Sequence, residues 1–138
     1  MNNFIHSDLT EKAIKAFYNV YNELGFGFLE KVYENAMSVE LTKFGIEHTL
    51  QKPIEVFYKK KMVGSYFSDI CLEDKVVIEL KAVSALSEIH EVQLVNYLKA
   101  SNIEVGLLLN FGKTPEVKRR VLTKEFKNHI NHNKSASI

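Results

Sequence analysis

Three charged side chains interrupt two neighbouring segments that consist mostly of apolar and β-branched residues. Asp69 lies in the segment 67–72, and Glu79 and Lys81 lie in the segment 75–82. Residues two apart on a strand share one face, so Glu79 and Lys81 are expected to point the same way. Charged groups among apolar neighbours are normally paired or bound to a metal. This stretch is therefore the strongest chemical signal in the chain.

The turn between the two segments decides whether the two acids meet. A two-residue turn would set Asp69 opposite Ile78. A three-residue loop over residues 73–75 pairs Ile70 with Ile78, and that register also sets Asp69 opposite Glu79. The longer loop separates apolar from polar residues cleanly, which a slip of one residue would undo. Since like charges directly opposite destabilise a sheet, this register predicts a divalent cation between the carboxylates, for which Mg²⁺ is the natural candidate. An ordinary exposed ion pair on the strand is the alternative.

The surrounding sequence predicts an α/β fold. Apolar residues at helical spacing predict three helices, over residues 10–24, 28–44 and 87–100. β-branched and aromatic runs predict four strands, over residues 54–58, 63–72, 75–83 and 105–110. Thr114, Pro115 and Glu116 suit the N-cap, first position and first turn of a final helix. The order α-α-β-β-β-α-β-α is expected to form a single domain, residues 1–127, with a polar and flexible tail over residues 128–138.

Composition excludes several classes of protein. Apolar residues make up 46% and charged residues 25%, as in globular proteins, and the single cysteine rules out an intrachain disulfide. The N-terminus lacks the blocks of a signal peptide, and no run approaches the roughly 20 apolar residues of a membrane span, so we expect a cytoplasmic protein. The net charge of +1 neither demands nor excludes a polyanionic partner. No phosphate-binding or dinucleotide-binding glycine motif supports a metabolic enzyme.

Two short basic clusters are the local candidates for contact with nucleic-acid phosphates. One stands on a predicted hairpin tip, at Lys59, Lys60 and Lys61, and the other stands early in the predicted last helix, at Lys118, Arg119 and Arg120. Contacts of this kind weaken as salt rises. The alternative is that both clusters are simply solvated.

Polar residues on two predicted helices are further candidates. His90, Gln93 and Tyr97 stand at positions i, i+3 and i+7, so they share one helix face. Gln93 could hold a water or a phosphate oxygen, with Tyr97 supporting it from the next turn, unless the face is an ordinary amphipathic edge. Glu30 lies in the first turn of its helix, where the macrodipole alone favours an acid.

Taken in order, these motifs resemble those of the GxxExxY proteins, a branch of the PD-(D/E)XK nuclease superfamily. The GxxExxY motif stands at residues 27–33, the D…(D/E)xK signature at Asp69 and residues 79–81, and a QxxxY element at residues 93–97. The resemblance runs from about Thr10 to Leu122. One departure is Ser68, which occupies the position of the superfamily's proline.

The resemblance implies a restriction-endonuclease-like core, a mixed sheet flanked by helices, and an Mg²⁺-dependent nuclease that acts on DNA, with RNA not excluded. Asp69, Glu79 and the backbone carbonyl of Leu80 would hold Mg²⁺, or Mn²⁺ as a substitute, and Glu30 would add a carboxylate through water. Lys81 would orient the attacking water and offset phosphate charge, with Gln93 and Tyr97 in support. A catalytically silent module that binds nucleic acid or a protein partner is the alternative. Dimerisation is common among such nucleases, so a homodimer is a further expectation.

Overall fold

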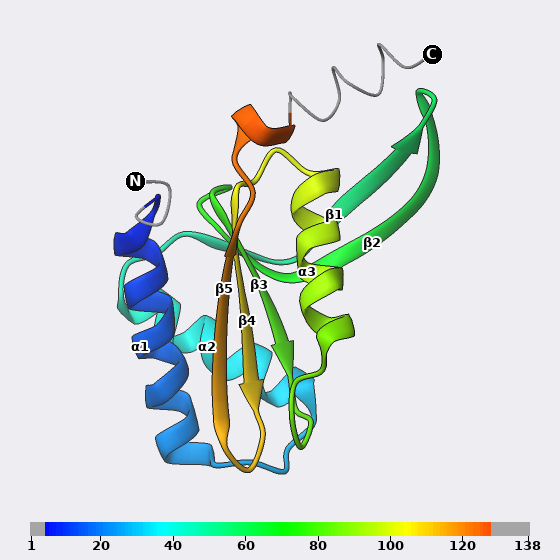
Figure 1. Cartoon of the computed structure of the whole chain (residues 1–138). Helices are drawn as coiled ribbons and strands as arrows, with labels where there is room; N and C mark the ends of the chain where they lie inside the picture. Colours follow the sequence, from blue (N-terminus) through cyan, green and yellow to red (C-terminus); the bar gives the residue numbers. More distant parts are fainter. Residues whose placement is uncertain (1–4, 128–138) are drawn as a thin grey trace.

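A five-stranded mixed sheet, in the order β1-β2-β3-β4-β5, forms the centre of the computed structural model, which describes residues 5–127 (Figure 1). The strands are β1 (His48–Tyr58), β2 (Lys61–Leu72), β3 (Val76–Lys81), β4 (Val105–Phe111) and β5 (Pro115–Val121). The helices are α1 (Ser7–Leu24), α2 (Glu30–Lys43) and α3 (Glu88–Ala100). β3 and β4 are parallel and the other neighbouring strands are antiparallel, so α3 provides the crossover that a parallel pair requires.

Helices cover both faces of the sheet. On one face, α1 and α2 pack side chains such as Phe17 and Met37 against Ile78. On the other face, α3 packs Leu94 against Val77. Val77 and Ile78 enter different cores because successive strand residues point to opposite faces. All seven residues of β4 are buried, as expected for a strand with helices on both sides. The predicted α/β class, a mixed sheet flanked by helices, is confirmed.

The hairpin between β2 and β3 has the longer of the two predicted loops. Ile70 pairs with Ile78. The Lys75 N–H donates to the Leu72 carbonyl at 2.8 Å and closes the turn. The positive φ angles that this turn needs fall on Glu73 and Asp74, at 48° and 57°. The strand register that brings the two acids together is therefore present.

The predicted last helix is wrong. Pro115–Val121 forms β5, which pairs with β4 from Phe111–Pro115 to Val105–Val121, and a helical turn begins only at Lys124. The order is therefore α-α-β-β-β-α-β-β over the described residues. Proline is tolerated as the first residue of an edge strand, and charged side chains on an edge discourage pairing with another chain. The predicted tail, residues 128–138, lies outside the described residues.

A side chain at Gly106 of β4 would collide with Leu94 of α3. A Cβ atom at Gly106 of β4 would stand 2.7 Å from Cδ1 of Leu94 on α3, closer than carbon atoms can pack. The bare glycine lets the helix approach the strand, and it thereby sets the height of α3 above the sheet. Across residues 5–127, none of the helices has the length and apolar character needed to cross a bilayer.

Candidate active site

The two predicted acids meet where the paired part of β2 and β3 ends. The regular pairing stops at Ile70 and Ile78, and Asp69 and Glu79 are the next residues on their strands. The Asp69 N–H donates to Glu79 Oε2 at 3.3 Å, and the Leu80 N–H donates to Asp69 Oδ2 at 2.8 Å. Each carboxylate thus accepts a backbone hydrogen bond from the opposite strand. Beyond the last paired residues, the two carboxylates replace the backbone-to-backbone hydrogen bonds between β2 and β3, and these contacts hold the acids between the strands.

Glu79 is electrostatically unsatisfied in this arrangement. Its residue is only 6% exposed, and Oε1 is buried without a hydrogen-bond partner among residues 5–127. Burial, followed by the negative charge of Asp69, raises the pKa of Glu79 to about 9. A buried carboxylate without a partner is costly, so a group that removes this cost must be either a proton or a cation.

Lys81 ends β3, and a buried polar network fixes the chain that follows it. The side chain of Asn110 accepts from the Val83 N–H at 3.0 Å and donates to the Val83 carbonyl at 2.9 Å. Asn110 also donates to Glu116 Oε2 at 2.8 Å, and this oxygen accepts from the Leu86 N–H at 3.0 Å. The exit of β3 is thereby tied to β4 and β5. Lys81 is half-buried there, and its charge lowers the pKa of Glu79, against the larger raising effects of burial and of Asp69.

Glu30 joins this group from α2, of which it is the first residue. Desolvation raises the pKa of Glu30, and the charge of Lys81 is the next largest influence and lowers it. The charge of Asp69 raises this pKa and that of His90 lowers it. Charged groups from β2, β3 and α3 therefore all lie near enough to the Glu30 carboxyl group to affect its pKa. The structure brings these four sequence-predicted residues to one place.

Tyr33 holds the loop that leads to Glu30. Its buried hydroxyl donates to the Gly25 carbonyl at 2.7 Å and accepts from the Phe28 N–H at 3.2 Å. Its ring stacks on Phe111 of β4, with centroids 4.1 Å apart. The last residue of the GxxExxY motif is thus a core residue that shapes the approach to the site.

α3 reaches the acids through Tyr97. Desolvation, followed by the charge of Glu79, raises the pKa of Tyr97 to about 12. The Tyr97 ring packs on that of Tyr66 from β2, with centroids 4.4 Å apart. Gln93 lies one turn before Tyr97, and its side chain is exposed. Since residues four apart share a helix face, Gln93 is on the side of α3 from which Tyr97 meets the site.

His90 has a structural use at the start of α3. Its Nδ1 accepts from the Ser87 N–H at 3.1 Å, which satisfies one of the free amides that precede the helix. The same imidazole lies near enough to act on the Glu30 carboxylate. His90 is therefore a capping residue at the border of the site.

The sequence profile of the PD-(D/E)XK nuclease superfamily matches residues 7–121. The chain belongs to this superfamily. The crystal structure of SSO0001 is similar in fold, with a TM-score of 0.52 and 20% sequence identity. That similarity covers 93% of this chain and 65% of the SSO0001 chain, so the protein spans about two thirds of the other's length. Among curated proteins there is no significant match.

The first basic cluster stands at the tip of the β1–β2 hairpin, away from Asp69 and Glu79. Lys59 and Lys60 form the turn between β1 and β2, and Lys61 begins β2. The second cluster is on a strand, and two of its members have other partners. Arg119 donates to the Ile5 carbonyl at 2.6 Å, and Arg120 forms an ion pair with Glu91 of α3. Lys118 precedes them on β5 opposite Leu108, which itself pairs with Glu79 of β3, so Lys118 stands two strands from Glu79 in the sheet.

Three residues around the site were not among the candidates that the sequence suggested. Glu34 is buried in α2, one turn after Glu30, and accepts hydrogen bonds from Lys31 and Gln51. Gln51 has a φ of 55° within β1, a conformation that non-glycine residues rarely adopt. Tyr66 covers Tyr97. The sequence could have indicated only Glu34, an acid among the buried positions of α2. Gln51 and Tyr66 depend on contacts between distant segments.

The donor set fits a hard divalent cation. Within residues 5–127, no three His, Cys, Asp or Glu side chains converge as a metal-binding group, so Glu30 does not stand beside the pair as a direct ligand. Mg²⁺ is typically bound by one or two carboxylates and keeps several waters. Asp69 and Glu79, with its unpartnered Oε1, supply two carboxylates of this kind.

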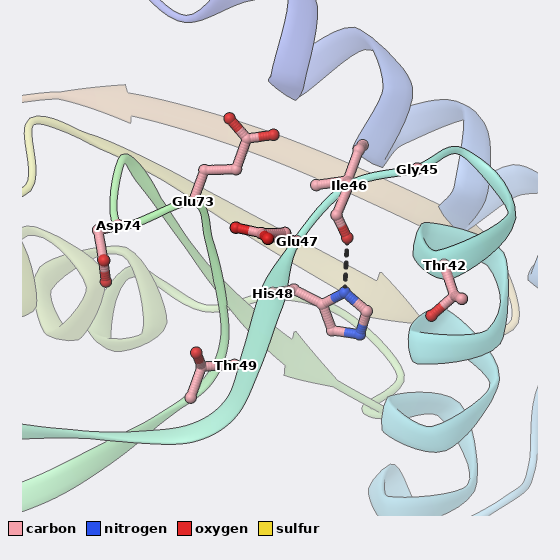
Figure 2. A pocket seen from close by; sticks show the side chains of 8 residues that line it. All are labelled: Thr42, Gly45, Ile46, Glu47, His48, Thr49, Glu73 and Asp74. Carbon is pink, nitrogen blue, oxygen red and sulfur yellow. Dashed lines mark hydrogen bonds between the residues drawn. The ribbon is translucent and has the colours of Figure 1, made fainter.

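A pocket lies at the other end of β3 from the two acids (Figure 2). It has a volume of about 560 Å³, and its lining residues come from the end of α2, the start of β1 and the β2–β3 turn. His48 stands in it with Nδ1 2.9 Å from the Ile46 carbonyl and Nε2 2.7 Å from Ser38 Oγ. Both ring nitrogens therefore have partners already. None of the sequence-predicted site residues lines this pocket.

Proposed function

We propose that the protein is an Mg²⁺-dependent nuclease that hydrolyses phosphodiester bonds, with DNA as the substrate. The observation that carries this proposal is the carboxylate pair of Asp69 and Glu79, in which a buried oxygen lacks a partner, beside the ammonium group of Lys81. Membership of the nuclease superfamily supports it. The motif at residues 27–33 supports placement in the GxxExxY branch.

The cation would be held by Asp69, Glu79 and the Leu80 carbonyl, with Mn²⁺ as a substitute for Mg²⁺. When bound, the ion lowers the pKa of water and stabilises the charged oxygens of phosphoryl transfer. The protein's contribution is the fixed spacing of the two acids, which the crossed backbone hydrogen bonds enforce. Such preorganisation spares the site a rearrangement during the reaction.

The remaining groups act on the substrate and on water. Lys81 offsets negative charge on the scissile phosphate and helps to orient the attacking water. Gln93 holds a water or a phosphate oxygen from α3, and Tyr97 limits the mobility of that side of the site. Glu30 adds a carboxylate at the edge, where it accepts a hydrogen bond from a water molecule.

The test is a cleavage assay on single-stranded and double-stranded DNA, and on RNA, with Mg²⁺ or Mn²⁺. We expect metal-dependent cleavage that Asp69→Ala and Lys81→Ala abolish. Glu73→Ala is the matched control, because it removes an acid of the same hairpin at the far end of β3. Equal cleavage by all four proteins would point to a contaminant and refute the assignment. Binding of DNA without cleavage under any metal condition would favour the catalytically silent alternative.

Two further expectations accompany the proposal. Residues 1–127 form one folding unit, which limited proteolysis tests. A homodimer, expected from the resemblance to related nucleases, is tested by analytical ultracentrifugation of the intact chain.

A further inference from the structure

The hairpin of β1 and β2 extends beyond the body of the molecule. In Figure 1 its closed end projects past α3 and away from the rest of the sheet. The body covers the inner half, where Ile54 and Ser68 are buried, whereas residues 57–65 are all exposed. We refer to the outer part, residues 56–66, as the arm. Residues 57–65 therefore add exposed surface without contributing to the core.

The charge of the arm is one-sided. It contains three lysines and no acidic residue. The whole chain has a net charge of +1, so the residues outside the arm are net −2. A concentration of positive charge on a projecting element is the pattern expected for contact with a polyanion.

Turn geometry does not account for these lysines. Lys59 and Lys60 are the two central residues of the turn, with φ angles of 50° and 68°. Two-residue turns with both φ angles positive strongly favour Asn and Gly, because other residues are strained there. Lysine is therefore a locally unfavourable choice at both positions. The positive charge itself is the remaining physical reason for it.

Apolar side chains border the lysines. Phe57 pairs with Met62 across the arm, and Tyr58 pairs with Lys61. Each of the three apolar residues is more than half exposed, and the Lys59 ammonium group lies 5.4 Å from the centre of the Tyr58 ring. Exposed apolar groups that adjoin one another commonly mark a binding surface. The arm thus offers both charge and apolar contact at one end.

The distance from the arm to the acids is set by β2. Lys61 and Asp69 are eight positions apart on this strand. At about 3.3 Å per residue, an extended strand places the tip at most roughly 26 Å from the carboxylate pair. That length corresponds to about eight base pairs of duplex DNA at about 3.4 Å each.

We infer that the arm is a docking element for duplex DNA and grips the helix up to about eight base pairs from the bond to be cleaved. This inference rests on the proposed nuclease function. The lysines bind backbone phosphates, and Phe57 and Met62 contact the groove, which is wide enough in B-DNA to admit a two-stranded ribbon. A rigid arm suits a stiff duplex, because phosphates at this separation keep a fixed geometry only in a double helix.

The decisive variant is Lys59→Asn combined with Lys60→Gly. It removes two charges and at the same time installs the residues that the turn favours, so the fold is expected to be as stable or more stable. The control is Lys12→Ala with Lys15→Ala, which removes the same charge from exposed positions of α1. All binding measurements use Asp69→Asn protein to prevent cleavage. The probe is a fluorescent duplex of about 30 base pairs, several times the span of the arm, or one strand of it alone.

The readout is the dissociation constant by fluorescence anisotropy between about 50 and 200 mM salt. We expect the arm variant to bind the duplex more weakly, and the slope of log affinity against log salt to fall by about 1.8, or 0.9 for each lost phosphate contact. The control variant should keep the slope of the parent protein. Thermal melting of each protein confirms that the fold is intact.

Three results would overturn the inference. One is an unchanged affinity and slope in the arm variant, and another is a loss confined to single-stranded DNA. The third is a change of sedimentation coefficient without a change in DNA binding, which would make the arm a protein interface. The nuclease proposal has its own readout. If Asp69→Ala in a wild-type background cleaves DNA as well as the unmodified protein, that proposal fails whatever the arm does.

Discussion

Replacing Glu79 by Gln should stabilise the metal-free protein at neutral and alkaline pH. Burial and the charge of Asp69 raise the pKa of Glu79 to about 9, so the native carboxyl group is protonated at pH 7. In the unfolded chain the same group has an ordinary pKa near 4.5 and is ionised. Gln is neutral in both states and has nearly the shape of a protonated Glu. The variant therefore avoids the free-energy cost of protonating residue 79 on folding, which wild type carries at neutral pH.

The sign and size of the effect follow from proton linkage. Between the two pKa values the native state binds one more proton than the unfolded state, so stability falls by about 1.4 kcal/mol per pH unit. This contribution is fully present below about pH 4.5 and is lost as pH rises toward about 9. From about pH 5.5 to about pH 7.5, the stability of the Gln variant relative to wild type should rise by about 3 kcal/mol. That is a large fraction of the stability of an ordinary domain.

The assay is urea unfolding of both proteins in EDTA at several pH values across this window. Parallel pH profiles would refute the reasoning, because they would mean that Glu79 is ionised and satisfied in the native protein. Repeating the titration with excess Mn²⁺ tests the site itself. The ion should stabilise wild type and flatten its pH dependence, since it replaces the proton, and it should not stabilise the Gln variant.

Three other changes test separate parts of the site. Lys81→Ala should lower DNA cleavage by about 10²-fold or more while Mn²⁺ affinity, measured by titration calorimetry, stays within a few-fold of wild type. Gly106→Ala should lower both the melting temperature and cleavage, because the new Cβ would stand 2.7 Å from Cδ1 of Leu94 and force this buried side chain to repack between α3 and the sheet; retention of both would contradict the packing. Tyr33→Phe removes the hydroxyl that bonds to Gly25 at 2.7 Å and should cost about 1–3 kcal/mol in denaturant unfolding, with wild-type stability as the contrary result.

The heart of the site was predictable from local pattern because β-strands impose a strict period. Alternation along β2 and β3 favoured one register, and that register alone set Asp69 against Glu79. The structure confirms the Ile70–Ile78 pairing that this register requires. The pairing of Asp69 with Glu79 could be predicted without knowledge of contacts between distant segments. Only the position of the strained turn residues differs from the rule that glycine comes last in such loops.

The last element shows where local chemistry fails. Thr114, Pro115 and Glu116 satisfy the rules for a helix start, yet the same residues also suit the start of an edge strand. Pairing with β4 decides between them, and no short-range signal reports on that pairing. Glu116 illustrates the cause, because its carboxylate serves Asn110 and Leu86, which no reading of its neighbours could reveal.

Four residues at the proposed site or arm depart from what their local structure favours, as Glu73 and Asp74 also do in the β2–β3 turn and His6 does before α1. Glu79 buries an unpartnered oxygen, Gln51 adopts a positive φ inside a strand, and Lys59 with Lys60 occupies a turn built for Asn and Gly. Each strained backbone position costs on the order of 1–3 kcal/mol. Stability alone would remove such features, whereas a site that must accept a cation and a polyanion requires them. A variant in which one of these features is removed should therefore be more stable and bind DNA or metal less well. If the feature had a purely structural role, its removal would instead lower stability.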